Sequence, residues 1–245
     1  MSATSEIETL QLRNGVQSGT LAQGVVRAIL TYIRDNELKV GENILSEGEF
    51  AQQFGVSRTV VREAFKALAA MNIIEVGVGR RARVSEFDGS VMALTLGHAL
   101  RTQQVTVQQV WDVRRAVELR SVALACLHRT DREAARIRAL IDRMDETRGD
   151  VAMMTEHDIE FHVTIAEATR NALFPVLVKS LTTAMRETNP IVWQVRTQEQ
   201  EQREVIDWHR AIARAIEQRD APAATKAMSR HFDEATLSLA NSGFN

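Results

Sequence analysis

ILSEGEFAQQFGVSRTVVREAFKALAAMNII, residues 44–74, decides the fold of the first part of the chain. Within it, Ser46 and Glu49 have the spacing of a capping box, in which each side chain accepts a hydrogen bond from the other residue's backbone at the start of a helix. Gly55 can take the left-handed conformation that ends such a helix, and Ser57 can cap the next one. Two short helices joined by a tight glycine turn are typical of a helix-turn-helix.

The residues that follow predict a β-hairpin. Two short runs, IIEV at 73–76 and ARVS at 82–85, flank the turn-rich GVGRR at 77–81. Short β-forming runs around glycines indicate a hairpin. Directly after a helix-turn-helix, this hairpin would be the wing of a winged helix-turn-helix domain.

Basic residues gather in this region, although the whole chain carries a net charge of -2. Residues 58–83 contain six Lys or Arg and two Glu, a local excess of four positive charges. Arg58 and Arg62 lie one turn apart at the start of the second helix, the end that enters the major groove in such motifs. Their guanidinium groups could contact guanine edges or phosphates there. A solvated basic face is the alternative, but the caps, the turn glycine and the basic hairpin together favour DNA binding.

Length and composition favour a two-domain protein of the cytoplasm. The 245 residues suffice for one small and one medium domain. Cys126 is the sole cysteine, so no disulfide can form within the chain, which fits a reducing compartment. The first residues are polar and acidic, unlike a signal peptide, and no apolar run reaches membrane-spanning length. We therefore expect a cytoplasmic protein without a membrane partner.

The chain is expected to be mainly α-helical and to have four parts. These are a flexible arm, a winged helix-turn-helix domain, a short polar linker and an all-α domain, at residues 1–19, 20–85, 86–90 and 91–245. Helical periodicity and capping boxes predict a seven-helix bundle in the last part. Its segments are expected at about 89–102, 107–128, 131–147, 151–169, 172–187, 191–219 and 222–241. Asn189-Pro190 is interpreted as the break before the sixth segment.

Four polar residues are predicted to lie on inward faces of this bundle. Asp158 and His162 are one helical turn apart on an apolar stripe. His209 and His231 are each eleven residues from Asp220, where a turn is expected, so they would face each other in an antiparallel helix hairpin. Each residue alone could be an ordinary core residue. Three imidazoles and one carboxylate that converge suit a divalent metal, with Zn most favoured and Ni or Mn as alternatives.

Arg114 is a further inward polar residue, on a stripe with Val107, Val110 and Val117. A buried guanidinium needs a partner, because an unpaired buried charge is costly. Glu118, one turn on, could supply a salt bridge. Alternatively, Arg114 could clamp an anionic ligand, for which its planar fork is suited. The spacing leaves both interpretations open.

From about residue 20 to 241, the chain resembles the GntR family of bacterial transcription regulators, in particular the FadR subfamily with an FCD effector domain. ILSEGEFAQQFGVSRTVVREAFKAL resembles the winged-helix signature of that family. VRRAVE, DIEFH, His209 and His231 fall where the family's helical domain has an arginine and metal ligands. The chain departs from the family pattern at Val40-Gly41, where Pro-Gly is usual, and at Arg81, which replaces the second glycine of the wing tip.

The resemblance implies a ligand-responsive regulator that binds a palindromic double-stranded operator as a homodimer, and we interpret the protein as a repressor and not an enzyme. It implies a metal, often zinc or nickel, that is held by Asp158, His162, His209 and His231. It implies that a small organic acid binds beside the metal, with Arg114 as a contact. The residues expected to contact DNA are Arg58, Thr59 and Arg62, with Ser46 before them and Gly79, Arg80 and Arg81 at the wing.

Two other functions are compatible with some of these residues. The ion itself could be the signal, which would make the protein a pure metal sensor. Three histidines, one aspartate and an open position could also activate water in a metal-dependent enzyme that acts on organic acids. The enzyme is disfavoured because no spare inward carboxylate is predicted near the cluster to serve as a general base.

Overall fold

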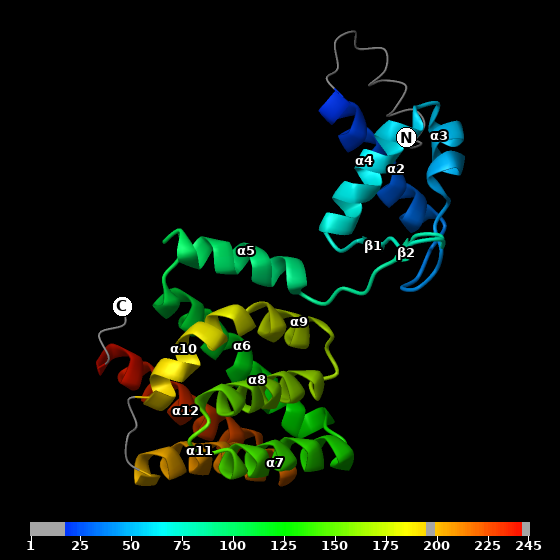
Figure 1. The fold of residues 1–245 in the computed structure, drawn as a ribbon. Coiled ribbons are helices and arrows are strands. Elements are labelled where there is room, and N and C mark those ends of the chain that lie inside the picture. Colours follow the sequence, from blue (N-terminus) through cyan, green and yellow to red (C-terminus); the bar gives the residue numbers. More distant parts are fainter. Residues whose placement is uncertain (1–17, 195–198, 242–245) are drawn as a thin grey trace. The chain divides into compact units, whose positions relative to one another are not determined.

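The computed structural model describes residues 18–194 and 199–241, and the chain divides into two compact units at Val91–Met92 (Figure 1). The arm predicted for residues 1–19 lies outside the described residues, apart from Ser18 and Gly19, which begin the first described helix. The elements of the first unit are α2 (Ser18–Asp35), α3 (Glu47–Phe54), α4 (Arg58–Ala70), β1 (Ile74–Glu75) and β2 (Arg83–Val84).

The helix-turn-helix forms as its sequence predicts. Both halves of the capping box between Ser46 and Glu49 are present at the start of α3. Gly55 ends α3 in the left-handed conformation with φ 64°, and the Ser57 side chain accepts from the Val60 N–H at the start of α4. The local signals alone therefore placed both helices and the turn between them.

An aromatic cluster holds the helices of this unit together. Phe50 stacks on Phe54 with ring centroids 5.2 Å apart, and it meets Tyr32 and Phe65 edge-on at 5.1 and 6.0 Å. Such pairs stabilise beyond the area that they bury. The hairpin is antiparallel, with Ile74 opposite Val84. The wing is thus confirmed, and its paired strands are shorter than the apolar runs that predicted it.

All the regular elements in the described residues of the second unit are helices, as predicted (Figure 1). Its helices are α5 (Ser90–Arg101), α6 (Val107–His128), α7 (Asp131–Glu146), α8 (Val151–Glu167), α9 (Leu173–Ser180), α10 (Thr182–Gln194), α11 (Glu199–Glu217) and α12 (Ala221–Asn241). The predicted capping boxes at Thr106 and Thr130 are both present. None of the described helices is long and apolar enough to cross a membrane.

The number of helices differs from the seven expected, because the described part of residues 172–219 contains three helices and not two. The break falls at Leu181, between α9 and α10, whereas Pro190 lies inside α10. A proline inside a helix removes one backbone hydrogen bond. Met185, five residues before Pro190, and Trp193, three residues after it, are buried, and their packing offsets that loss. The predicted break at Asn189-Pro190 is therefore wrong.

Helices α11 and α12 form the antiparallel hairpin that the spacing around Asp220 predicts. Arg219 has φ 59° in the turn, and the Asp220 side chain accepts from the Ala223 N–H at 2.9 Å. Helices α11 and α12 pack closely against each other, and α12 also packs along α6 (Figure 1). The main core of this unit lies among α6, α7, α8, α11 and α12, and the candidate site lies within it.

Candidate metal centre

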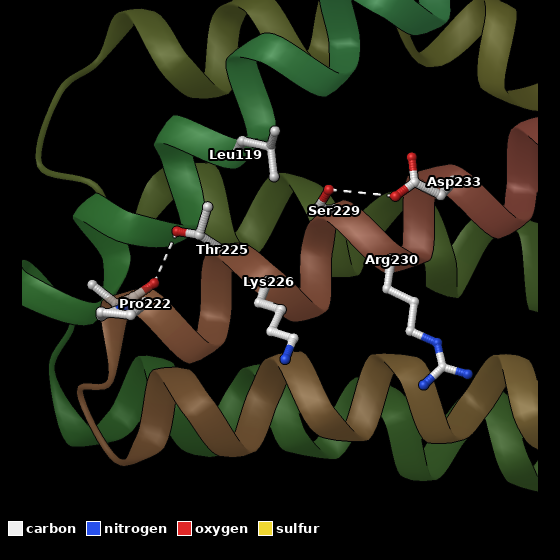
Figure 2. A pocket seen from close by; sticks show the side chains of 8 residues that line it. Leu119, Pro222, Thr225, Lys226, Ser229, Arg230 and Asp233 are labelled. Carbon is white, nitrogen blue, oxygen red and sulfur yellow. Dashed lines mark hydrogen bonds between the residues drawn. The ribbon is translucent and has the colours of Figure 1, made fainter.

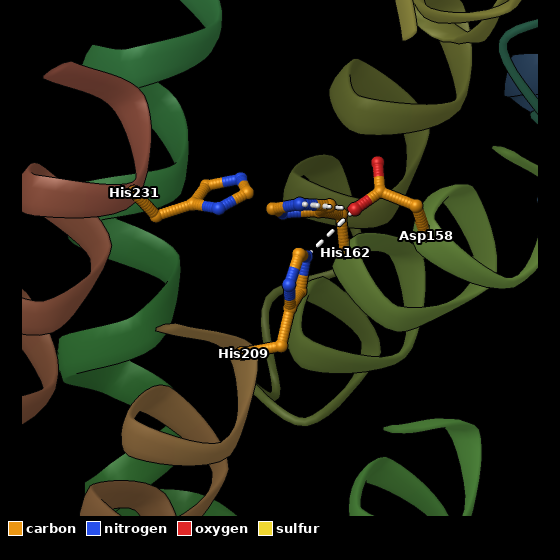
Figure 3. Close-up of side chains that lie close together, drawn as sticks. All are labelled: Asp158, His162, His209 and His231. Atoms are coloured by element: carbon orange, nitrogen blue, oxygen red, sulfur yellow. Dashed lines mark hydrogen bonds and ion pairs between the residues drawn. The ribbon is translucent and has the colours of Figure 1, made fainter. Parts of the chain in front are cut away.

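Asp158, His162, His209 and His231 converge between α8, α11 and α12 (Figure 3). Each offers one ligand atom, and the four atoms lie within 4.8 Å of one another. All four residues are buried. The sequence-based prediction that these residues meet in the bundle therefore agrees with the geometry.

His209 presents a lone pair to the cluster. Its Nδ1 lies 2.8 Å from the Val205 carbonyl oxygen, and because a carbonyl only accepts, Nδ1 carries a proton. In the neutral ring, Nε2 is then an acceptor, and it lies 2.7 Å from Asp158 Oδ1. Two acceptors at this distance need a second proton between them, or they must move slightly apart around a shared metal ion.

Asp158 is held on its other side by Asn189. The Asn189 Nδ2 group donates to Asp158 Oδ2 at 2.6 Å, which leaves Oδ1 facing the imidazoles. Burial raises the pKa of Asp158, but the adjacent His162 and His209 outweigh burial and hold this pKa well below its usual value. The carboxylate is therefore charged, as a metal ligand must be.

His162 is held by Glu118 of α6. Glu118 Oε2 forms an ion pair with His162 Nδ1, and His162 Nε2 lies 3.6 Å from Asp158 Oδ1. Neither ring nitrogen has a partner in hydrogen-bond geometry. Burial, the largest single influence, lowers the pKa of His162, but the Glu118 and Asp158 carboxylates together outweigh it, so the net shift is upward. Metal-bound histidines typically donate their other N–H to such a carboxylate, which fixes the tautomer.

His231 is a neutral imidazole. Burial, followed by His209 and His162, lowers its pKa well below the usual value. Its ring centroid lies 4.6 Å from that of His209 and 5.1 Å from that of His162. His231 Nδ1 is buried and has no hydrogen-bond partner.

This donor set fits a divalent cation. Ligand atoms at about 2.1 Å from a metal lie about 3 to 4.2 Å from one another. The cluster therefore needs only small adjustments, in which the widest separations shorten and the 2.7 Å pair of Asp158 Oδ1 and His209 Nε2 opens. A cation would also relieve the facing acceptors of Asp158 and His209 and satisfy the buried His162 Nε2. Three nitrogens and one carboxylate suit zinc, nickel or manganese.

Arg114 lies beside the cluster, with part of its guanidinium unpaired. Its Nε donates to Glu118 Oε1 at 2.6 Å, while both terminal amino groups are buried without a hydrogen-bond partner. The guanidinium lies 4.9 Å from the ring centroid of Trp111 and 5.1 Å from that of Phe232. The salt bridge and the free donors thus coexist, so the two interpretations of Arg114 do not exclude each other.

A small cavity adjoins the free amino groups. Its volume is about 20 Å³, enough for about one water molecule. The polar residues that line it are Arg114, Asp158, Asn189, His209 and His231. A larger, shallow groove of about 770 Å³ lies between α6 and α12 and displays the cations of Lys226 and Arg230 (Figure 2). None of the residues that line this groove is fully buried, so its chemistry is that of an open surface.

The residues expected to contact DNA lie on the helix-turn-helix and the wing of the first unit. Arg58, Thr59 and Arg62 are exposed at the start of α4, and Gly79, with φ 71°, lies at the wing with Arg80 and Arg81. Ser46 is half-buried and caps α3.

Several of these cations are paired with acidic neighbours. Arg62 Nε lies 3.2 Å from Glu47, Arg81 lies 2.9 Å from Glu49, and Arg80 lies 3.4 Å from Glu75. These ion pairs are exposed and therefore weak, so the arginines can exchange them for other anions.

Two residues of the site were missed from the sequence. The sequence predicts Glu118 only as a partner of Arg114, although it lies on the same buried stripe of α6 and also contacts His162. The predicted helix break at Asn189-Pro190 conceals the role of Asn189. The spacing of Met185, Asn189 and Trp193, one turn apart, was the available signal for a buried helix face.

Comparisons with known proteins assign the family. Residues 21–84 match the family described as bacterial regulatory proteins, gntR family, and residues 109–234 match the FCD domain. The chain belongs to the GntR family. It is 30% identical to the HTH-type transcriptional regulator LutR of Bacillus subtilis over 203 residues, which cover 81% of this chain and 92% of LutR.

Other GntR-type relatives match over similar lengths. The Glc operon transcriptional activator of Escherichia coli K12 is 28% identical, covering 86% of this chain and 85% of that protein. The HTH-type transcriptional repressor NanR of Salmonella newport is 27% identical, covering 87% and 83%. The structure titled Streptococcus agalactiae GntR has the same fold, with a TM-score of 0.69 at 24% identity over 89% of this chain and all of that one.

The protein is therefore a bacterial transcription regulator and not an enzyme. Its winged helix-turn-helix implies DNA binding, and its FCD domain implies binding of a small-molecule effector.

Proposed function

We propose that this GntR-family protein is a metal-containing repressor that responds to a small carboxylate and binds a palindromic operator as a homodimer in the cytoplasm. The observation that carries this proposal is the pair of unpartnered amino groups on Arg114, buried beside a four-residue metal-ligand cluster. Buried donors without partners are rare and costly. An anion that reaches them would remove that cost.

Zinc is the ion that we propose, with nickel or manganese as alternatives that the same donors accept. Asp158, His162, His209 and His231 would hold it. When bound, the ion supplies a Lewis-acidic centre with open positions that a carboxylate oxygen can fill. Asn189 and Glu118 orient the two ligands that α8 contributes.

Arg114 would recognise the carboxylate by its planar fork. Its guanidinium is fixed by Glu118 and lies near the rings of Trp111 and Phe232, so the two free amino groups are preorganised for two parallel hydrogen bonds. The adjoining cavity holds about one water. An organic acid must therefore widen it, which would move α6, α8, α11 or α12 relative to one another.

On the DNA side, we propose that Arg58, Thr59 and Arg62 of α4 contact the major groove. Gly79, Arg80 and Arg81 would follow the backbone or the minor groove at the wing, and Ser46 would lie near the phosphates. In a homodimer, the two recognition helices must lie about one DNA turn apart, roughly 34 Å. An effector-dependent change of that spacing would change affinity for the operator.

The sign of regulation is proposed as repression. NanR is named a repressor, whereas the Glc operon protein is named an activator. The experiment that tests the proposal is a gel shift of the metal-loaded protein with DNA from upstream of its own gene. We expect sequence-preferring binding by a dimer and release by a small carboxylate. Equal affinity for upstream DNA and random DNA would overturn the proposal.

A pure metal sensor is the second candidate, and one observation favours it. The cavity beside the cluster has room for about one water and for no organic acid, as expected if the ion itself is the signal. Titration of operator binding with acid at saturating metal separates the two functions. A response to metal without any response to acid would support the sensor.

A further inference from the structure

Glu118 contacts both Arg114, the proposed carboxylate-binding residue, and His162, a proposed metal ligand. Its Oε1 accepts from Arg114 Nε at 2.6 Å, and its Oε2 is paired with His162 Nδ1. The side chain of Glu118 is only 2% exposed, so water does not compete for either contact. A single buried carboxylate therefore joins the guanidinium of α6 to an imidazole of α8.

This arrangement dictates which nitrogen of His162 is available. A carboxylate offers only acceptors, so the nitrogen that faces it must carry the proton. His162 is then protonated on Nδ1, and its Nε2 faces Asp158 Oδ1 at 3.6 Å. Glu118 also orients Arg114, because it accepts the hydrogen bond from Nε while both terminal amino groups remain without a partner.

We infer that Glu118 is a positioning residue that sets the tautomer of His162 for metal binding and aims Arg114 at the carboxylate. This inference rests on the proposed metal- and carboxylate-binding function. The metal site and the anion site are thus two ends of one chain of buried ion pairs from Arg114 through Glu118 to His162. The expected consequence is that a change at Arg114 alters the effect of a change at Glu118 on metal affinity.

The chemistry of glutamine makes this consequence specific. Arg114 has donors only, so in Glu118→Gln the amide oxygen must turn towards Arg114 and the amide NH₂ towards His162. His162 Nδ1 would then have to accept, and in the neutral ring the proton would move to Nε2, the nitrogen that faces the cluster. Zn²⁺ affinity should fall about 10- to 100-fold, as for other residues that orient metal ligands.

The double variant Arg114→Met with Glu118→Gln should recover that loss. Without the guanidinium, the amide can flip and turn its oxygen to His162, which restores the proton on Nδ1. A role of Glu118 in packing alone would give no such recovery, because glutamine and glutamate have nearly the same shape. Arg120→Met, an exposed change on the same helix, is the matched control for loss of one positive charge.

The test is Zn²⁺ affinity of the full-length chain, measured by competition with a fluorescent chelator for the wild type, E118Q, R114M, R114M/E118Q and R120M. We expect E118Q alone to be weakened, with the double variant close to R114M. Equal affinity of E118Q and wild type, or a double variant as weak as E118Q, would overturn the inference. If E118Q does not fold, R114M and R114M/E118Q still test the inference. A tenfold difference in Zn²⁺ affinity between these two variants would contradict the expected flip of the glutamine amide in the double variant.

Nitrogen-15 NMR of the imidazole ring in the metal-free protein provides an independent measurement. At a pH where the ring of His162 is neutral, we expect the proton on Nδ1 in the wild type and on Nε2 in E118Q. The same tautomer in both would overturn the role of Glu118 even if zinc binds. Failure of the wild type to bind Zn²⁺, with the tautomer switch observed, would instead overturn the proposed metal function and retain the assignment of Glu118.

Discussion

Replacement of Arg114 by methionine tests the proposed carboxylate clamp most sharply. Methionine fills a similar volume between Trp111 and Phe232 and removes both free amino groups. Two charge-assisted hydrogen bonds would be lost, each worth about 1.5 to 3 kcal/mol. The sum of about 3 to 6 kcal/mol corresponds to a loss of about 10²- to 10⁴-fold in affinity for the acid.

The stability of the ligand-free protein should change much less. Breaking the buried pair with Glu118 costs about 3–5 kcal/mol, and removal of two unsatisfied buried donors returns about 1–3 kcal/mol for each, or about 2–6 kcal/mol together. We therefore expect the free energy of unfolding to change by no more than about 3 kcal/mol in either direction. Arg114→Lys keeps the charge but not the planar fork, so its acid affinity should be intermediate.

The assay is calorimetric titration of the zinc-loaded variants with acetate, malonate, succinate and malate. Arg120→Met serves as the control, because it removes an exposed charge from the same helix. We expect the acid that binds the wild type to bind R120M with equal affinity and to bind R114M about 10²- to 10⁴-fold more weakly. Unchanged binding by R114M, or equal weakening in R114M and R120M, would refute the role of Arg114.

Three further perturbations have defined outcomes. Asn189→Leu removes the 2.6 Å hydrogen bond to Asp158, and metal affinity measured by chelator competition should fall about 10- to 100-fold; unchanged affinity would contradict the orienting role. Glu133 has a pKa lowered to about 2, chiefly by Arg170, so its contribution to stability is present above pH 4.5 and lost as the pH falls towards 2. Glu133→Gln should therefore destabilise by about 1 kcal/mol at neutral pH, with urea melts of the two proteins converging in acid; a gap that persists at pH 2 would argue against the ion pair. Arg58→Ala should weaken operator binding, measured by fluorescence anisotropy across a salt series. If Arg58 contacts a phosphate, the slope of log affinity against log salt concentration should become shallower by about 1. If Arg58 contacts a base, binding should weaken by about 1–3 kcal/mol and the preference for the operator sequence should relax. No change in either the salt slope or the sequence preference would exclude contact by Arg58.

Local signals in the sequence determined much of the first unit. The capping box at Ser46, the left-handed turn at Gly55 and the cap at Ser57 each depend on hydrogen bonds between residues no more than four positions apart. Such short-range chemistry needs no knowledge of the tertiary fold. The hairpin followed from its glycines in the same way, although β1 and β2 are each only two residues long.

The metal ligands were predictable because helical geometry relates them. Asp158 and His162 share one face of α8, and the turn near Asp220 places His209 opposite His231. Glu118 could not be connected to His162 in this way, because that contact depends on how α6 packs on α8. Periodicity identifies inward faces but does not say which two inward residues touch.

At Pro190, in contrast, a local sequence signal led to a wrong prediction. Proline breaks helices by local chemistry, yet α10 continues through it because Met185, Asn189 and Trp193 are buried along one face. Tertiary packing outweighed the local signal there. The error also concealed Asn189, whose hydrogen bond to Asp158 makes it part of the candidate site.

Thermal melting of the purified protein with acetate, malonate, succinate or malate, with and without a strong chelator, tests the central claim most directly. A ligand at a hundredfold excess over its Kd stabilises by about 2.7 kcal/mol. We predict that one acid raises the melting temperature and that the chelator abolishes this gain, because metal and Arg114 bind the carboxylate together. If no acid shifts the melt while the chelator alone lowers it, the metal is structural or is itself the signal, and the proposed carboxylate response is contradicted.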